Sequence, residues 1–371
     1  MIGSGFIAKA HSNAFRQVNH FFQTPYDLEL KLICSRTQSK LDAMASQWGW
    51  KETQTNWRDV VSRPDIDVID IATPNALHAP IAIAAAQAGK IILCEKPLAS
   101  TLEEAERMTS AASTIPTLVW FNYRRAPAVA LAKRMIDEGR VGQVYHYRGL
   151  YLNESGNDPS KTSGWRYRRS ESGSGAMGDL LSHSLDTALL LNGPLADLTA
   201  MTHTFAAGRD VDDAVALLTH FANGSVGTFE ATRFGVGHRN QHFFEIHGSR
   251  GMLRFDLEDM NRLIFYDATA VPAERGPRVI TATGPDHPYS DNFWKPGHAI
   301  GYEHTFIATL GDFLLALSRN APFHPNFADA LAIQRLLHDF GANARRAAFE
   351  RTLLFSSRKN DRWHQRPANR F

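Results

Sequence analysis

The first third of the chain alternates short apolar runs with segments of helical pattern. The apolar runs are Leu28–Cys34, Val68–Ala72, Ile91–Cys94 and Thr117–Trp120. The segments predicted as helices are Leu41–Trp48, Ala79–Ala88 and Leu102–Ala112. Gly89 supports the end of the second helix, because glycine commonly follows the last helical turn. Strands that alternate with helices of this length predict βαβ units on a parallel sheet.

The pattern changes near residue 120, beyond which strands are separated mainly by turns. The predicted strands are Val144–Tyr151, Ala214–Phe221, Val226–Arg233 and Phe243–His247. The dipeptide Asn223-Gly224 between two of them predicts a β-hairpin. The predicted helices are Ala128–Glu138, Ala176–Leu191, His304–Leu317 and Ala328–Ala348, and the tail from Ser356 is predicted to be solvated. We therefore expect an antiparallel sheet with helices on one face.

Length, charge and cysteine content narrow this picture. The chain has 371 residues, which suggests two domains, and we place them at residues 1–120 and 121–371. A net charge of +2 gives no support to a nucleic-acid or membrane-surface partner, and no apolar run is long enough to span a bilayer. The two cysteines, Cys34 and Cys94, do not make a disulfide-built secreted fold, so we expect a reducing compartment, the cytoplasm.

The chain opens on a glycine turn with the pattern G-x-G-x-x-A, from Gly3 to Ala8. The first glycine allows a tight turn, and the second lets the backbone approach a pyrophosphate at the helix N-terminus. At the head of a βαβ series, this pattern predicts a dinucleotide site. Only Met1 and Ile2 precede it, whereas a strand usually needs about five residues. We therefore expect a truncated or alternative start.

The end of the second strand bears on the choice between NAD and NADP. An NAD site usually places an acidic residue there, on the ribose hydroxyls. This chain reads Ser35-Arg36-Thr37 instead, with Lys40 one turn on. Hydroxyl and guanidinium groups can bind a 2′-phosphate, and no carboxylate repels it. The segment predicts NADP as the preferred cofactor, with NAD possible; the alternative is that Arg36 faces solvent and either cofactor is accepted.

Two further motifs carry candidate proton chemistry. Glu95-Lys96-Pro97 follows a strand, at the edge where open parallel sheets bind ligands, so Lys96 can hydrogen-bond a substrate hydroxyl; a surface salt bridge is the alternative. Asp179 and His183 lie four residues apart on one predicted helix face. An imidazole beside a carboxylate favours a proton acceptor, but a hydrogen-bonded helix pair is also open. No third residue of convincing metal-ligand spacing lies nearby, so we expect no metal.

Taken in order, the glycine turn, Thr73-Pro74-Asn75, Glu95-Lys96-Pro97 and the Asp179/His183 pair resemble the Gfo/Idh/MocA family of nicotinamide-dependent sugar and cyclitol oxidoreductases. The likeness covers nearly the whole chain. Further segments are most similar to the branch of levoglucosan and inositol dehydrogenases; these are Phe121–Arg125, Gly164–Arg166, and the stretch with Gly297-His298 and Gly301-Tyr302.

The resemblance implies a fold, an assembly and a reaction. The fold is an α/β one, with an N-terminal Rossmann domain and a C-terminal domain built on a large open, mostly antiparallel sheet. Members commonly pair through this sheet, so a homodimer or homotetramer is expected, and the Lys96–Pro97 peptide is often cis. The implied reaction is oxidation of a secondary ring hydroxyl to a ketone. His183 would accept the hydroxyl proton with Asp179 orienting it, and Lys96 would bind the same oxygen; which of His183 and Lys96 accepts first stays open.

The resemblance also assigns residues to ligands. The cofactor residues are Gly3, Gly5, Phe6, Ile7, Ser35, Arg36, Thr37, Lys40, Thr73, Pro74, Asn75, His78, Glu95, Lys96, Asn122, Trp165 and Arg166. The substrate residues are Lys96, Tyr123, Asn153, Arg166, Asp179, His183 and His298, with Tyr302 closing the pocket. The expected substrates are levoglucosan, a glucoside at its third carbon, and an inositol, in that order. The alternatives are a non-catalytic dinucleotide-binding regulator and a reductase of a non-sugar substrate.

Overall fold

The computed structural model describes residues 1–157 and 164–341. The predicted solvated tail and the end of the last predicted helix lie outside the described residues. Among those described, no helix is both long enough and apolar enough to cross a membrane.

The N-terminal domain is a parallel sheet covered by helices, as the alternating pattern predicted. Its strands are β1 (Leu32–Cys34), β2 (Glu52–Gln54), β3 (Val68–Ile71), β4 (Ile91–Cys94) and β5 (Thr117–Val119). Its helices are α1 (Phe6–Phe21), α2 (Gln38–Trp48), α3 (Trp57–Val61), α4 (His78–Gln87) and α5 (Leu102–Ala111). The strands β3, β4 and β5 pair in that order, and Ile2 bridges Cys34 of β1 to Ile71 of β3. The glycine turn therefore leaves the middle of the sheet.

The second domain is built on an eight-stranded sheet in the order β13-β12-β11-β10-β6-β9-β8-β7. Its strands are β6 (Val144–Leu152), β7 (Leu195–His203), β8 (Ala214–Phe221), β9 (Val226–Thr232), β10 (Gln241–Gly248), β11 (Gly251–Asp256), β12 (Arg262–Asp267) and β13 (Pro277–Thr281). All neighbours are antiparallel except β6 and β9. The predicted hairpin at Asn223-Gly224 joins β8 to β9. The sequence did not predict β2, α3, β7, β11, β12, β13 or the short helix α7 (Arg169–Ser172).

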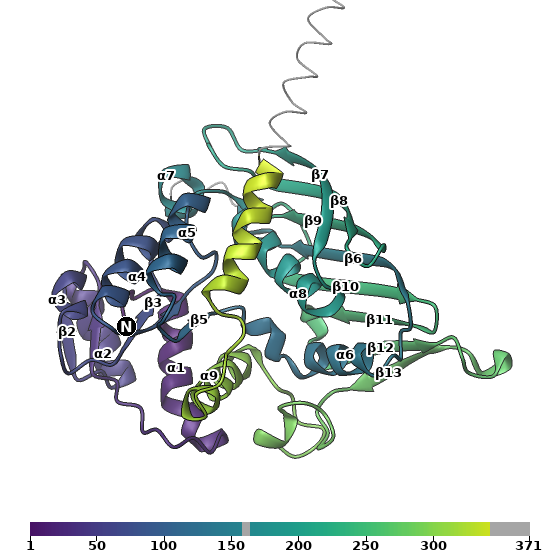
Figure 1. The fold of residues 1–371 in the computed structure, drawn as a ribbon, viewed down its shortest axis with the longest axis horizontal. Coiled ribbons are helices and arrows are strands. Elements are labelled where there is room, and N and C mark those ends of the chain that lie inside the picture. Colours follow the sequence, from purple (N-terminus) through teal and green to yellow (C-terminus); the bar gives the residue numbers. More distant parts are fainter. Residues whose placement is uncertain (158–163, 342–371) are drawn as a thin grey trace, which may run out of the picture.

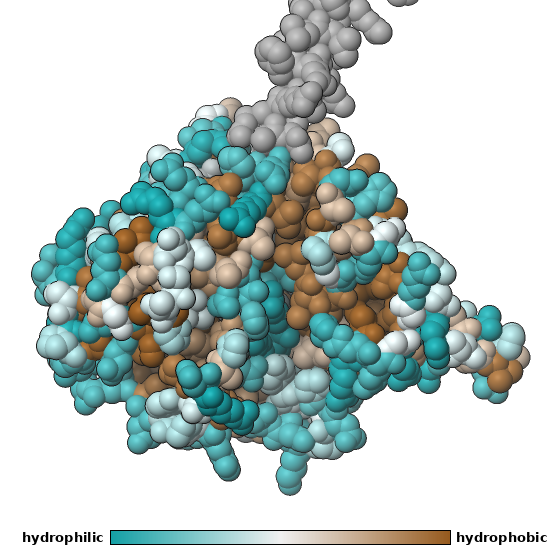
Figure 2. Space-filling view, in the orientation of Figure 1, coloured by the Kyte–Doolittle hydropathy of each residue, from teal (hydrophilic) through white to brown (hydrophobic). Residues whose placement is uncertain are grey.

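Helices cover one face of this sheet and leave the other open (Figure 1). The helices of this part of the chain are α6 (Pro127–Asp137), α7 (Arg169–Ser172), α8 (Ser182–Asn192), α9 (Tyr302–Ser318) and a helix over 327–341. Strand β8 alternates buried and exposed residues, with Leu218 exposed on the open face. Met201 of β7 is exposed as well. Figure 2 shows hydrophobic residues gathered where Figure 1 draws the sheet.

The C-terminal part of the described chain returns to the N-terminal domain. Helix α9 packs on α1, where Gly311 leaves room for the Phe22 ring; a Cβ at Gly311 would lie 2.5 Å from that ring. Val119 N donates to Pro325 O at 3.0 Å, and Phe327 N donates to Thr117 Oγ1 at 3.1 Å. The free edge of β5 is thus covered by residues more than 200 positions later in the chain.

Candidate functional site

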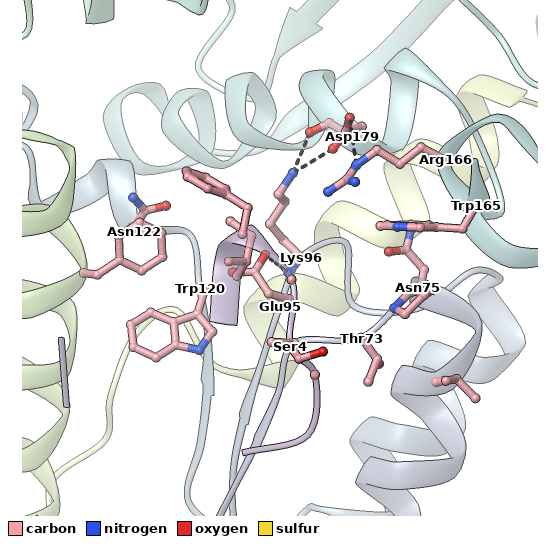
Figure 3. Close-up of a pocket in the computed structure, with 18 of the residues that line it drawn as sticks. Ser4, Thr73, Asn75, Glu95, Lys96, Trp120, Asn122, Trp165, Arg166 and Asp179 are labelled. Atoms are coloured by element: carbon pink, nitrogen blue, oxygen red, sulfur yellow. Dashed lines mark hydrogen bonds and ion pairs between the residues drawn. The ribbon is translucent and has the colours of Figure 1, made fainter. Parts of the chain in front are cut away.

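A cavity of about 870 Å³ lies between the two domains. Its lower part in Figure 3 is formed by the carboxyl ends of the N-terminal strands, with Ser4, Thr73 and Glu95. Its upper part is formed by the second domain, with Trp165, Arg166 and Asp179. The location agrees with the rule that open parallel sheets bind ligands beyond the carboxyl ends of their strands.

The glycine turn has the geometry of a pyrophosphate site. Gly3 has a φ of +130°, and a Cβ there would lie 2.2 Å from Ala72 O, so no other residue fits. Gly5 has nothing within 4 Å of its Cβ position, which leaves space in front of α1. Within the described residues, no side chain caps the start of α1, so its amides are free to bind an anion. The turn therefore fits a dinucleotide.

The other side of the turn lies beside the end of β1. Ser4 Oγ donates to Ser35 Oγ at 3.0 Å, which joins the turn to the predicted ribose segment. The cavity is lined here by Ser35, Arg36, Thr37, Lys40, Thr55 and Trp57. These residues include two cations and no carboxylate, so this end of the cavity attracts anions.

Lys96 extends from the end of β4 to Asp179 of the second domain (Figure 3). Its Nζ donates to Asp179 O at 2.7 Å and to Asp179 Oδ1 at 3.1 Å. Lys96 is the middle residue of the motif Glu95-Lys96-Pro97, and the peptide bond between Lys96 and Pro97 is cis, as expected. Lys96 thus links the two domains across the cavity.

Asp179 is surrounded by cations. Arg233 donates from Nη2 to Asp179 Oδ2 at 3.0 Å, and Arg166 Nε lies 3.9 Å from the same oxygen. Burial would raise the pKa of Asp179, but Lys96, Arg233 and Arg166 outweigh burial and hold it well below its usual range. The carboxylate is therefore ionised, and Lys96 and Arg233 occupy its two oxygens.

His183 faces the same cavity and is held by aromatic rings rather than by Asp179. Its ring lies 4.7 Å from the Tyr123 centroid and 5.8 Å from that of Phe121. In the described part of the chain, no group hydrogen-bonds the His183 ring. The prediction that Asp179 orients His183 is corrected here, because Asp179 sits in a π-helical turn, Met177–Leu181, that presents its carboxylate to Lys96 and Arg233. Burial and then Lys96 lower the pKa of His183 well below its usual value, so the ring is neutral.

A triangle of neutral polar groups lies beside His183. The Tyr123 and Tyr151 hydroxyls are 3.2 Å apart, and Tyr151 OH donates to Asn240 Oδ1 at 2.7 Å. Asn240 Nδ2 lies 3.4 Å from Tyr123 OH. Glu258 fixes this loop, since its Oε1 accepts the Asn240 backbone N–H at 3.0 Å. These three side chains can donate hydrogen bonds to the hydroxyl groups of a ligand and can accept hydrogen bonds from them.

The structure brings most of the predicted site residues together. Those that line the cavity are Gly3, Gly5, Phe6, Ile7, Ser35, Arg36, Thr37, Lys40, Thr73, Pro74, Asn75, Glu95, Lys96, Asn122, Tyr123, Asn153, Trp165, Arg166, Asp179, His183 and Tyr302. Two predicted residues lie outside it. His78 is buried, with Nδ1 3.1 Å from Pro97 O and Nε2 3.1 Å from Thr73 O, so its ring supports these two loops from behind the cavity. His298 bonds Lys295 O in an exposed loop.

Sequence reasoning missed several residues of the site. Tyr151 lies on a predicted strand, and its place on the inward-facing side was the signal that could have found it. Arg233 ends the predicted strand Val226–Arg233, but nothing local marks its contact with Asp179, 54 positions away. Asn240 follows a glycine-containing loop and carries no signal that we recognise.

Comparisons with known proteins agree with this geometry. Residues 1–123 match the model of an oxidoreductase family with an NAD-binding Rossmann fold, and residues 129–254 match that of the GFO/IDH/MocA C-terminal domain. Levoglucosan dehydrogenase from Pseudarthrobacter phenanthrenivorans is 40% identical over 90% of this chain and 92% of its own length. A solved complex of levoglucosan dehydrogenase with NADH and levoglucosan superposes with a TM-score of 0.91 at 40% identity, covering 93% of this chain and 96% of that one. An oxidoreductase domain protein from Kribbella flavida gives the same TM-score at 41% identity and the same coverage.

Proposed function

Because this chain belongs to the Gfo/Idh/MocA family of oxidoreductases, we propose that it oxidises a secondary ring hydroxyl of a cyclic polyol to a ketone. The observation that carries the proposal is the meeting of Lys96, Asp179 and His183 in one cavity with the dinucleotide-type glycine turn. The neutral triangle of Tyr123, Tyr151 and Asn240 supports an uncharged, hydroxyl-rich substrate. Levoglucosan, a glucoside at its third carbon, and an inositol are the candidates in that order.

The residues of the chain divide the proton chemistry among them. A nicotinamide dinucleotide bound at the glycine turn would supply the redox chemistry, as the acceptor of the hydride from the substrate carbon. His183, neutral and facing the cavity, accepts the hydroxyl proton. Lys96 donates a hydrogen bond to the same oxygen and stabilises the negative charge that develops on it. Asp179 holds the Lys96 ammonium in place, and Arg233 holds Asp179.

The cofactor we propose as preferred is NADP. Ser35, Arg36, Thr37 and Lys40 line the ribose end of the cavity and supply hydroxyls and cations but no carboxylate. The relative solved with NADH shows that NAD(H) fits this fold, so the preference has to be measured on this chain. Steady-state kinetics with both cofactors should give a higher kcat/KM for NADP, and Ser35→Asp with Arg36→Ala should reverse the order. A clear preference for NAD in the unmodified enzyme would contradict the proposal.

The substrate is tested by following formation of the reduced cofactor across pyranoses, anhydrosugars and inositols. We expect activity on at least one cyclic polyol, with the highest kcat/KM on levoglucosan or a glucoside. Activity confined to linear alcohols or aldehydes would refute the proposed substrate class.

The proposed setting is a cytoplasmic homodimer or homotetramer with two domains that divide near residue 120. Both cysteines are buried and free, in keeping with a reducing compartment. The open sheet face exposes Met201, Leu218 and Val226, which favours association through this face. Light scattering coupled to size exclusion should give a multiple of the 41.3 kDa chain mass, and Leu218→Glu should lower it.

A further inference from the structure

A buried network of charged side chains adjoins the cavity and has no part in the proton chemistry above. His11, on α1, directs both ring nitrogens at carboxylates: Nδ1 lies 2.9 Å from Asp70 Oδ2, and Nε2 lies 3.1 Å from Glu95 Oε1. Trp120 Nε1 donates to the other Asp70 oxygen at 3.0 Å, and its indole stacks on the His11 ring with 4.2 Å between centroids. The charged members are 0 to 7% exposed, so water does not screen them.

The geometry fixes the charge of this network. A neutral imidazole has one N–H, so a ring that meets a carboxylate at each nitrogen is satisfied only when both nitrogens are protonated. Burial alone would lower the pKa of His11, but Asp70 and Glu95 outweigh burial and raise it to about 9. One imidazolium between two carboxylates leaves a single net negative charge.

That charge is presented to the cavity by Glu95. Glu95 lines the cavity, whereas His11 and Asp70 lie outside it. Glu95 Oε2 accepts the backbone N–H of Lys96 at 3.2 Å, so the carboxylate is fixed next to the lysine of the active site. The Lys96 ammonium points away from Glu95 and donates a hydrogen bond to the carbonyl oxygen of Asp179 at 2.7 Å. In Figure 3, Glu95 and Trp120 lie on the opposite side of Lys96 from Trp165.

We propose that the Asp70–His11–Glu95 network makes the site favour the oxidised cofactor, whose nicotinamide ring is cationic, over the reduced cofactor, whose ring is neutral. The inference rests on the proposed function, because that reaction requires the nicotinamide to lie beside Lys96. A net negative charge in a region of low dielectric attracts a cationic ring and leaves a neutral one unaffected. We expect a contribution of roughly tenfold to the ratio of the two affinities, which corresponds to about 1.4 kcal/mol.

The test is to measure the dissociation constants of the oxidised and reduced cofactor, by calorimetry and by fluorescence, without substrate. Glu95→Gln removes the charge at the cavity wall. Asp70→Asn leaves His11 facing one carboxylate, so the ring needs only one N–H and the network keeps its single negative charge on Glu95 at the cavity wall. Glu103→Gln, on the exposed side of α5, removes the same charge from the surface and is the matched control. Thermal melts establish that each variant is folded.

The network predicts that the affinity ratio shifts toward the reduced cofactor, by roughly tenfold, in Glu95→Gln, and that Asp70→Asn causes no such shift. Glu103→Gln should leave the ratio unchanged. An unchanged ratio in Glu95→Gln, an equal loss of both affinities in that variant, or a matching shift in Asp70→Asn would each overturn the inference.

A measurement on the unmodified chain covers the case in which a variant fails to fold. Nitrogen chemical shifts of His11 should show a doubly protonated ring at pH 7.5, and a neutral ring would overturn the proposal. If the unmodified chain bound neither form of the cofactor, the proposed function itself would fail, and this inference with it.

Discussion

Two histidines of this protein are similarly buried but differ in charge: His11 is cationic and His183 is neutral. His11 is 0% exposed and His183 is 6% exposed, so each pays a comparable desolvation cost when protonated. Asp70 and Glu95 overcome that cost at His11, where they raise the pKa to about 9. At His183, the positive charge of Lys96 adds to the desolvation cost and lowers the pKa further. Burial disfavours the charged ring at both positions, and only the two carboxylates beside His11 overcome it.

The surroundings of the two histidine rings account for this difference in charge. His11 lies on α1 and faces the ends of β3 and β4, where two carboxylates hold its positive charge. His183 lies among Phe121, Tyr123 and Tyr151, with a ring that no described residue hydrogen-bonds. A neutral ring with a free nitrogen is the state that a proton acceptor requires.

The strongest test of this contrast is to remove the neutral histidine or its cationic neighbour. His183→Ala and Lys96→Ala should each lower kcat by roughly two to four orders of magnitude, because each removes a group that acts on the reacting oxygen. Cofactor affinity, measured by fluorescence, should change little. His20→Ala, at an exposed histidine near the end of α1 and outside the cavity lining, is the control and should keep normal turnover. Near-normal turnover in either active-site variant would remove that residue from the mechanism.

The pH dependence of stability should show the two histidines acting in opposite directions. The folded pKa of His11 lies above the unfolded value of 6.5, so its stabilisation is complete below pH 6.5 and is lost as the pH rises toward 9. The loss should be on the order of 3 kcal/mol. The folded pKa of His183 is lowered, so it destabilises the fold as the pH falls below 6.5.

Urea unfolding between pH 5 and 9.5 measures both effects. The decline above pH 6.5 should be absent in His11→Gln, and the decline below pH 6.5 should be smaller in His183→Gln. An unchanged alkaline decline in His11→Gln would show that His11 is neutral in the folded protein.

Arg233 tests whether the cations around Asp179 act on catalysis as well as on structure. Arg233→Met should lower kcat by roughly 10- to 100-fold with a smaller change in KM, because a buried hydrogen bond between charged groups is lost and Asp179 no longer holds Lys96 in one position. Arg233→Lys should recover part of the loss. Arg254→Met, on the exposed side of β11, is the control. Equal losses in the lysine and methionine variants would show that the charge at this position does not matter.

The smallest effect is expected at the polar triangle beside His183. Tyr151→Phe removes the hydroxyl that bonds Tyr123 and Asn240, and should raise the substrate KM by roughly 2- to 10-fold with little change in kcat. Tyr145→Phe on the exposed part of β6 should have no effect. A fall in kcat without a change in KM would place Tyr151 in the chemical step instead of in binding.

The parts of the molecule that the sequence predicted are those encoded in contiguous residues. The glycine turn at Gly3–Ala8 and the motif Glu95–Pro97 combine a local conformation with a chemical group, and the structure places both in the cavity. The strands Ile91–Cys94 and Ala214–Phe221 were predicted with the bounds that the structure gives, since both are rich in apolar residues and the second ends just before the turn residues Asn223-Gly224. Strand β13 was missed because it is largely exposed and has little apolar pattern.

The partners of the site residues could not be predicted in the same way. Helical spacing put Asp179 and His183 on one face, but it could not show that two cations from other segments would take both carboxylate oxygens. The contact of His11 with Glu95 joins residues 84 positions apart. Such pairs depend on how the layers of the fold meet, and a single sequence does not encode that locally.

The covering of β5 by the distant C-terminal segment has a consequence for synthesis on the ribosome. When residue 120 has been translated, Val119 lacks its partner at Pro325, and Phe22 and Trp120 lack the apolar face of α9. At about 5 to 20 residues per second, the intervening chain takes roughly 10 to 40 s to appear. During that interval the nascent N-terminal domain presents an open strand edge and an uncovered apolar surface, both favourable to aggregation. We therefore expect the isolated segment 1–120 to require a chaperone, whereas the complete chain covers these surfaces itself.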